Sequence, residues 1–437
     1  MTGRLGSLAV LLALVGACGD NGGQSPAVDG ATDVSVAPDD GGLGEGGTPG
    51  NDGGSSADAA PPSAVTVTSF GDWVAAQVDD EPWTRLSATG DGRTYSIPIT
   101  PGATYRIAEH GVNSMGYSYL SVTCATALEA TTWLGLHALS THTVSGTIAG
   151  LQPTEDVDVA MMGAFQVGVM ATSPEFYLQT VVEGTRDLVA IVHAGAAEPV
   201  RMTMVRDLEV TDDRAGETID MSPGTGFSFE PHGFTVTAGQ GWARIFTANG
   251  TGAAGIGDTM LYPIWYAPIG ALGDGDLYSF LAVDETAKRT SLLNLPASDP
   301  AGDVQVDLGA VGPLAGVELV SPAPGRFTGL AYAPTAGGPP VGTYLIRVAQ
   351  VSQNVQWDLL VTAGCLAGQT EFTLPRLVDL DGWQLAWGIR GGANTEWQVT
   401  VMMADQPLRE WGTGGELTSL PQLRFESAEL SGSLFLY

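Results

Sequence analysis

From residue 65 to the C-terminus, the sequence alternates between short strand-like segments and turn signals every few residues. Segments such as 65–68, 94–97 and 234–237 are rich in β-branched and aromatic residues, as strands are. Glycine-containing turns such as Thr89–Gly92 separate them. No segment combines a 3.6-residue hydrophobic period with caps at both ends, and residues 124–139 come closest. The sequence therefore predicts an all-β fold, with two or three β-sandwich-like domains in series.

The N-terminus has the composition of an export signal. Arg4 precedes an apolar run at residues 8–15, and small residues then lead to Cys18. The run is too short to cross a bilayer, which takes about 20 apolar residues. A signal peptide that is removed is the interpretation we favour, and cleavage as an ordinary secreted protein is the alternative.

The segment Leu14–Cys18 resembles the lipobox of bacterial lipoproteins. The resemblance implies that residues 1–17 are the signal peptide and that Cys18 becomes the new N-terminus, acylated with palmitate or similar chains. Gly19 stands where an inner-membrane retention signal has aspartate, which favours the outer membrane. The protein is thus expected to be exported and held on the cell envelope by lipid on Cys18.

Residues 18–64 have the composition of a disordered tether. They consist mainly of Gly, Asp, Ala, Ser, Pro and Thr, with several acidic residues and no lysine or arginine. Such a segment cannot bury enough apolar surface to fold. The whole chain carries a formal net charge of −31, which excludes nucleic acid as a partner because phosphate binding needs a basic surface.

The remaining sequence divides into an N-terminal β domain at residues 65–143, a central module at 144–215 and a C-terminal β region at 216–437, which has room for two subdomains. The central module resembles the carboxypeptidase-regulatory-like, or transthyretin-like, β-sandwich. The segments that carry this resemblance are Val144–Ile148, Asp156–Val159, Phe176–Leu178, Val182–Ala190 and Arg206–Val210. The resemblance implies a spacer or binding scaffold without catalytic groups.

A wider resemblance, over about residues 70–300, is to uncharacterised lipoproteins of environmental Gram-negative bacteria. It rests on Glu81–Leu86, Thr94–Ile97 and Gly102–Ala108, followed by the strands at 187–190 and 206–208. It implies an envelope location and an architecture, with no established activity.

Several motifs resemble cofactor or metal sites but lack the flanking residues or the spacing that such sites need. Gly250–Gly255 matches a dinucleotide fingerprint, but a strand-like segment follows where the fingerprint needs a helix, so a hairpin loop is favoured. Asp379–Gly382 begins like a calcium loop but lacks the later ligands, which favours a turn. His137 and His142 have neither strand nor zinc-helix spacing. The sequence thus indicates no catalytic residue, no cofactor and no metal site.

Two further features leave alternatives open. Cys124 and Cys365 either form a disulfide between the first and last β regions or stay as two buried thiols. Tryptophans gather at Trp265 and at Trp383, Trp387 and Trp397, where they either stack on sugars or fill the core. Trp383 and Trp387 would share one face of a strand if that region is extended.

Together these features predict a lipid-anchored extracytoplasmic β protein with a structural or binding role at the cell envelope. Its expected partners are the membrane, through lipid on Cys18, and an envelope protein or glycan. The alternative is an extracytoplasmic hydrolase or a glycan-binding enzyme accessory, and a subunit of an envelope machine is a third interpretation. The lack of a catalytic motif favours a protein that is not an enzyme.

Overall fold

The computed structural model describes residues 64–436, with gaps at 91, 113–117, 135–140, 162–166, 195–197, 250–253, 260–262, 298–301, 309–311, 313, 322–324, 333–338 and 406–423. Cys18, with the signal peptide and nearly all of the expected tether, lies outside these residues. The all-β prediction is confirmed: the described residues form five sheets, and their helical turns are confined to η1 (Val351–Gln353), α2 (Ala363–Leu366) and η2 (Leu385–Trp387).

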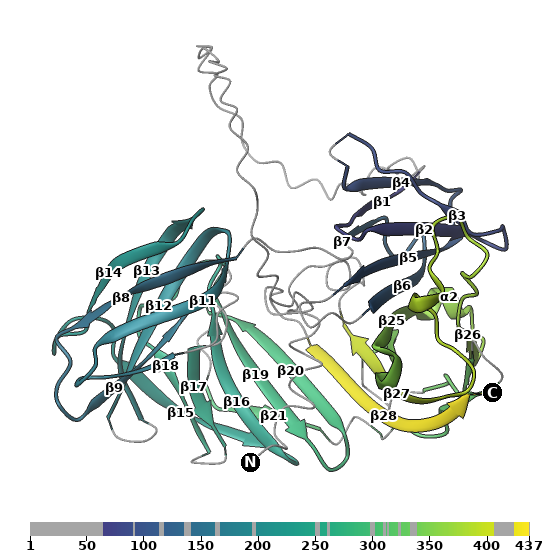
Figure 1. Ribbon diagram of the computed structural model, residues 1–437. Coiled ribbons are helices and arrows are strands. Elements are labelled where there is room, and N and C mark those ends of the chain that lie inside the picture. The colour runs from purple at the N-terminus through teal and green to yellow at the C-terminus, as the bar shows by residue number, and fades with distance from the viewer. Residues whose placement is uncertain are drawn as a thin grey trace, which may run out of the picture.

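The largest sheet has 15 strands and runs through the whole molecule (Figure 1). In spatial order its strands are β21 (Val304–Val306), β15 (Phe229–Val236), β18 (Ile264–Pro268), β17 (Ala254–Asp258), β16 (Gln240–Phe246), β19 (Leu277–Asp284), β20 (Arg289–Pro296), β28 (Arg424–Leu436), β27 (Ala393–Ala404), β24 (Val341–Gln350), β25 (Val355–Thr362), β6 (Ser118–Thr126), β5 (Thr104–Val112), β2 (Trp73–Val78) and β3 (Thr84–Arg85). The long strand β28 pairs with β20 on one side and β27 on the other.

The N-terminal strands share the sheet and the core of the C-terminal region. The two regions meet where β6 pairs in parallel with β25, from Ser118 opposite Val355 to Cys124 opposite Val361. On one face of this part, strands β22 (Glu318–Val320), β23 (Arg326–Thr328) and β26 (Glu371–Thr373) cover a core that includes Ile346, Trp357 and Phe327. The sequence assigned residues 65–143 to an N-terminal domain. Its described residues up to Leu134 are continuous in structure with the end of the chain, whereas residues 141–143 belong to β8 (Thr141–Ala149).

A small sheet covers the opposite face of the N-terminal strands. It consists of β4 (Thr94–Pro98), β1 (Ala64–Thr68) and β7 (Thr132–Leu134). Val65, Val67 and Ile97 pack from this sheet onto Tyr105 and Ile107 of β5. Alternate residues of β5 thus face two different cores, as the two-residue period of a strand requires.

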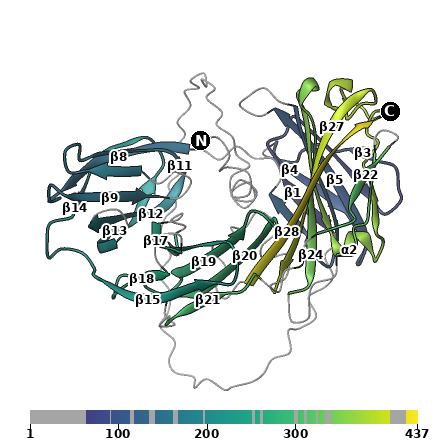
Figure 2. The same ribbon diagram turned by 90° about the horizontal axis from the view of Figure 1, so that it is seen from below.

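The central part of the chain forms a β-sandwich at the other end of the large sheet (Figure 2). One layer has the order β10 (Val167–Met170), β9 (Glu155–Ala160), β12 (Gly184–Ala194) and β13 (Glu198–Val210); the other has β11 (Glu175–Val182), β8 (Thr141–Ala149) and β14 (Arg214–Asp220). Strand β12 is buried on both faces. Leu188 and Val192 face the core between the layers, whereas Val189 and Ile191 pack on the large sheet against Phe280.

Candidate functional site

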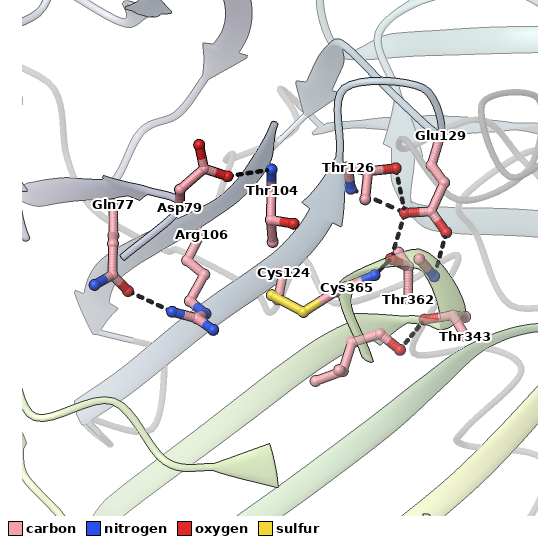
Figure 3. The surroundings of a disulfide bond; sticks show 12 residues. Gln77, Asp79, Thr104, Arg106, Cys124, Thr126, Glu129, Thr343, Thr362 and Cys365 are labelled. Atoms are coloured by element: carbon pink, nitrogen blue, oxygen red, sulfur yellow. Dashed lines mark hydrogen bonds between the residues drawn. A yellow bond between two sulfur atoms is a disulfide. The ribbon is translucent and has the colours of Figure 1, made fainter. Parts of the chain in front are cut away.

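A row of three side chains crosses the N-terminal strands beside the disulfide. Gln77 of β2 is opposite Arg106 of β5, and Arg106 is opposite Cys124 of β6. Directly opposed residues in antiparallel strands point to the same face, so the three side chains form one row. Figure 3 shows Gln77 and Arg106 pointing toward each other, with an Arg106 Nη1 to Gln77 Oε1 distance of 2.6 Å.

The row ends at a disulfide that joins Cys124 to Cys365 of α2 (Figure 3). Their Cα atoms are 5.7 Å apart, although the two residues are separated by 241 positions in sequence. Alternation of polar and apolar residues indicates which face of a strand is buried, not which distant segment lies against it, so the sequence alone left this pairing open.

The turn that follows β6 holds α2 in place through Glu129. Oε2 of Glu129 accepts hydrogen bonds from the Thr126 backbone N–H at 2.9 Å and from the Thr362 hydroxyl at 2.5 Å. Oε1 accepts the backbone N–H of Gly364 at 2.8 Å. A Cβ atom at Gly364 would lie 2.5 Å from the Glu129 carboxylate, so this close approach requires glycine. The disulfide and Glu129 therefore fix α2 against the N-terminal strands.

A cavity of about 290 Å³ adjoins this structure. Its volume is near the lower end of the roughly 300–1,000 Å³ that is usual for small-ligand sites. It is lined by Gln77, Trp83, Arg106, Arg326, Cys365, Leu366, Gln369, Glu371, Phe372, Thr373 and Pro375. Gln77 and Arg106 come from the N-terminal strands and Trp83 from the loop before β3. The others come from β23, from β26 and from α2 or the residues next to them. The disulfide thus joins the two sides of the cavity.

The cavity lining carries two guanidinium groups and one carboxylate. Arg326 Nη1 lies 2.8 Å from Glu371 Oε2, and both side chains are about half exposed. Arg106 is half-buried, and its hydrogen bond goes to the neutral Gln77 amide. Burial lowers the pKa of Arg106, while the negative charge of Asp80 works to raise it. The lining therefore has an excess of positive charge.

Trp83 contributes its indole to the cavity lining. The sequence did not single it out among the tryptophans that could stack on sugars. It is partly buried, and it packs at the edge of the core. Its signal in the sequence was only its place in the segment Glu81–Leu86. Because Trp83 comes from a loop between two strands, neither periodicity nor clustering of aromatics could identify it.

The tryptophans that the sequence did select lie mainly in the core. Trp265 is fully buried and contacts Phe280 edge to face, and Trp387 is 7% exposed. Trp383 and Trp387 do not lie on an extended strand: they meet around the turn η2, with ring centroids 5.5 Å apart. Trp397 of β27 packs against Phe327. Their common role is packing.

A hydrogen-bonded chain of Asp72, His110 and Ser118 lies at the other end of the same strands. Asp72 Oδ1 is 2.6 Å from His110 Nδ1, and Ser118 Oγ is 3.0 Å from His110 Nε2. The imidazole stacks on Trp387 at 3.7 Å between centroids. Burial lowers the pKa of His110, although Asp72 works to raise it, and the lowered pKa favours the neutral ring. A neutral ring bonded to aspartate and serine is the arrangement of a general base with its nucleophile.

The described parts of the other candidate motifs lie on strands and in a turn. Residues 250–253 of the glycine pattern are outside the described residues, and those after it form β17, which pairs antiparallel with β16 instead of starting a helix. Asp379–Gly382 lies in a turn, where the Asp381 carbonyl accepts the indole N–H of Trp73 and its carboxylate pairs with Arg85. His137 is outside the described part, and His142 lies on β8.

Two kinds of feature are absent from the described residues. No group of three or more His, Cys, Asp or Glu side chains within these ranges is placed to hold a metal ion. In the same ranges, no helix has the length and apolar character needed to cross a bilayer.

No protein family model matches the chain, and no curated protein matches it either. Among solved structures, the chain is similar to the crystal structure of a tetra-tandem repeat in the extending region of a large adhesion protein. The identity is 11% and the TM-score 0.17, over 86% of this chain and 99% of that chain. At this TM-score the likeness has no bearing on function.

Proposed function

We propose that the protein is a lipid-anchored protein of the bacterial cell envelope that binds a small polar ligand in the cavity beside the Cys124–Cys365 disulfide. The main support for this proposal is the composition of the cavity lining. It combines an indole, amide groups and guanidinium groups, and a covalent bond joins its two sides. A few oriented polar groups around an aromatic side chain are typical of small-molecule sites.

The anchor is acylated Cys18, at the outer membrane. Stable attachment takes two or more acyl chains, since each buried methylene contributes about 0.8 kcal/mol. A Gly-rich tether of about 46 residues has an end-to-end distance of roughly 35–40 Å. Its acidic residues repel one another and extend it further. The cavity would thus be carried well beyond the lipid headgroups, where ligands of the envelope are accessible.

The sandwich of β8–β14 acts in this proposal as a carboxypeptidase-regulatory-like spacer. It packs through Val189 and Ile191 on the large sheet, at the opposite end of the molecule from α2 (Figure 2). A spacer at this place separates the cavity from neighbouring proteins without contributing to the binding chemistry.

Metabolic labelling with a fatty acid tests the anchor. The wild-type protein should take up label and sediment with membranes, and the Cys18→Ala variant should do neither. A labelled, membrane-bound Cys18→Ala variant would overturn the lipid anchor.

Ligand-induced stabilisation tests the cavity. The full chain, purified in detergent micelles, is heated with a panel of neutral, amino and acidic saccharides. At least one saccharide should raise Tm in a saturable way, and replacement of Trp83 by alanine should abolish the increase. Trp397→Ala is the matched control, because that indole packs against Phe327 and is not part of the cavity lining. An equal increase in Trp83→Ala would contradict the assignment of the ligand to this cavity. No saturable increase with any saccharide would contradict a saccharide as the ligand.

The second candidate function is ester hydrolysis at Ser118, which the Asp72–His110–Ser118 chain favours. Ser118 Oγ would attack the ester carbonyl while its proton passes to His110 Nε2 and then to the leaving alcohol; water would release the acyl group by the same steps. A fluorophosphonate probe tests it. A covalent adduct on Ser118 that is lost in Asp72→Asn would support hydrolysis, and an unlabelled Ser118 would rule it out.

A further inference from the structure

The positive charge in the cavity is unusual for this protein. The chain has 48 acidic and 17 basic residues. Most described arginines face carboxylates, as Arg201 faces Glu155 at 2.6 Å and Arg347 faces Asp358 at 2.8 Å. Others, such as Arg186 and Arg390, donate to backbone carbonyls. Among the described residues, no carboxylate oxygen lies within 4.0 Å of the guanidinium nitrogens of Arg106. Its charge is therefore available to a ligand.

Position makes this charge effective for recognition. The Gln77 amide oxygen accepts from Arg106 Nη1 and so orients the guanidinium, yet it neutralises none of its charge. A guanidinium presents five N–H donors in a fork that matches a carboxylate. Hydrogen bonds between two charged groups are about twice as strong as neutral ones, and partial burial strengthens them.

The remaining lining suits a sugar ring better than a peptide. Trp83 provides an aromatic surface for the apolar face of a ring, and the amides of Gln77 and Gln369 can both donate to and accept from hydroxyl groups. Arg326 and Glu371 form an ion pair at the same cavity, so they add polar contacts without a large net charge. A cavity of about 290 Å³ limits the ligand to a small unit such as a chain end.

We infer that the cavity binds an acidic saccharide, with the ligand carboxylate on Arg106 and a sugar ring on Trp83. This inference rests on the proposed binding role of the cavity. It names the chemical class of the ligand, a uronic acid or its oligomer, and assigns to Arg106 the discrimination between acidic and neutral sugars.

Calorimetric titration of the full chain in detergent micelles tests the assignment, with digalacturonic acid as the acidic probe and cellobiose as the neutral one. Digalacturonic acid should bind, and cellobiose at least tenfold more weakly. Arg106→Gln should weaken digalacturonic acid tenfold or more and leave cellobiose unchanged. Arg106→Lys, which keeps the charge but not the fork, should give a smaller loss. Arg376→Gln is the matched control, since this arginine is 73% exposed and lies outside the cavity lining.

The titration results distinguish failure of the acidic-saccharide assignment from failure of the proposed binding function. Equal affinity for both sugars, or no change in Arg106→Gln, would overturn the acidic ligand while the cavity stays a sugar site. If neither a sugar nor an N-acetylated dipeptide binds, both proposals fail. Tighter binding of an N-acetylated dipeptide with a free C-terminus would overturn the saccharide. If Arg106→Gln does not fold, the salt dependence of wild-type binding decides: affinity for digalacturonic acid should fall as salt rises, and constant affinity would refute the ion pair.

Discussion

Arg206 of β13 holds Asp276, the residue just before β19, through two parallel contacts. Arg206 Nη1 is 3.0 Å from Asp276 Oδ1, and Nη2 is 2.5 Å from Oδ2. The same Nη1 lies 2.8 Å from Asp187 Oδ2. Asp187 and Asp276 are buried, whereas the Arg206 side chain is one-third exposed. One guanidinium thus pairs with two buried carboxylates and joins the sandwich to the large sheet.

Arg206→Ala should therefore lower the free energy of unfolding by about 3 kcal/mol, because it leaves two buried carboxylates without their cation. Chemical denaturation of the full chain measures the loss. Arg376→Ala is the control: its pair with Asp379 is exposed and should be worth at most about 1 kcal/mol. Equal effects of the two variants would show that the Arg206 network does not join the two parts.

The same network predicts a dependence of stability on pH. Burial works to raise the pKa of Asp187, but hydrogen bonds from the Asp207 amide, Thr247, Asn249 and Arg206 outweigh it and hold the pKa below 3.8. A lowered pKa in the folded state stabilises the protein above the unfolded pKa, and this stability is lost as pH falls through the folded value. The stability difference between wild type and Asp187→Asn should thus be constant above about pH 5 and shrink below about pH 4. A difference that stays constant to pH 2 would contradict the lowered pKa.

The disulfide should contribute roughly 2–4 kcal/mol of stability, because it closes a long loop in the unfolded chain. Denaturation of the protein with and without reductant measures this contribution. The Cys124→Ser, Cys365→Ser double variant should match the reduced wild type and should not respond to reductant. Peptide mapping of the exported protein should find the two cysteines linked; two thiols open to alkylation under denaturing conditions would rule out the bridge.

A buried hydroxyl gives a local prediction for the N-terminal core. The Tyr105 hydroxyl donates to the Ala130 carbonyl at 2.7 Å and accepts the indole N–H of Trp133. Burial raises the pKa of Tyr105 well above 10, so the phenol stays protonated. Tyr105→Phe leaves both partners unsatisfied and should cost about 1–3 kcal/mol by chemical denaturation. Tyr177→Phe, at a side chain that is 55% exposed, should be close to neutral, and a comparable loss there would contradict the assignment.

The sequence predicted the fold class well and the pairing of distant segments poorly. Alternation of residue types at 94–97 or 234–237 reports which face of a strand is buried, and this local signal was enough for an all-β assignment. The parallel contact between β6 and β25 depends on register across more than two hundred residues, which no local pattern encodes. The cavity depends on that contact, because Arg106 lies on one side of it and Cys365 on the other, so it could not be recognised from the sequence.

Residue type alone also gave incomplete predictions for the aromatic residues. Trp265 and Trp387 were open to a surface role or a core role, and burial decides for the core. The turn η2 brings Trp383 against Trp387. A helical turn there replaces the extended backbone that the two residues would need to share one face of a strand.

His110 and Ser118, only eight residues apart, meet because the strands β5 and β6 fold back on each other.

A crystal structure of the full chain with digalacturonic acid tests the central claim most directly. We predict that one sugar carboxylate lies within hydrogen-bond distance of the Arg106 guanidinium and that a sugar ring covers the Trp83 indole. A saturated crystal with the sugar bound elsewhere, or with the cavity beside Cys365 free of it, would contradict the assignment of this cavity as the binding site.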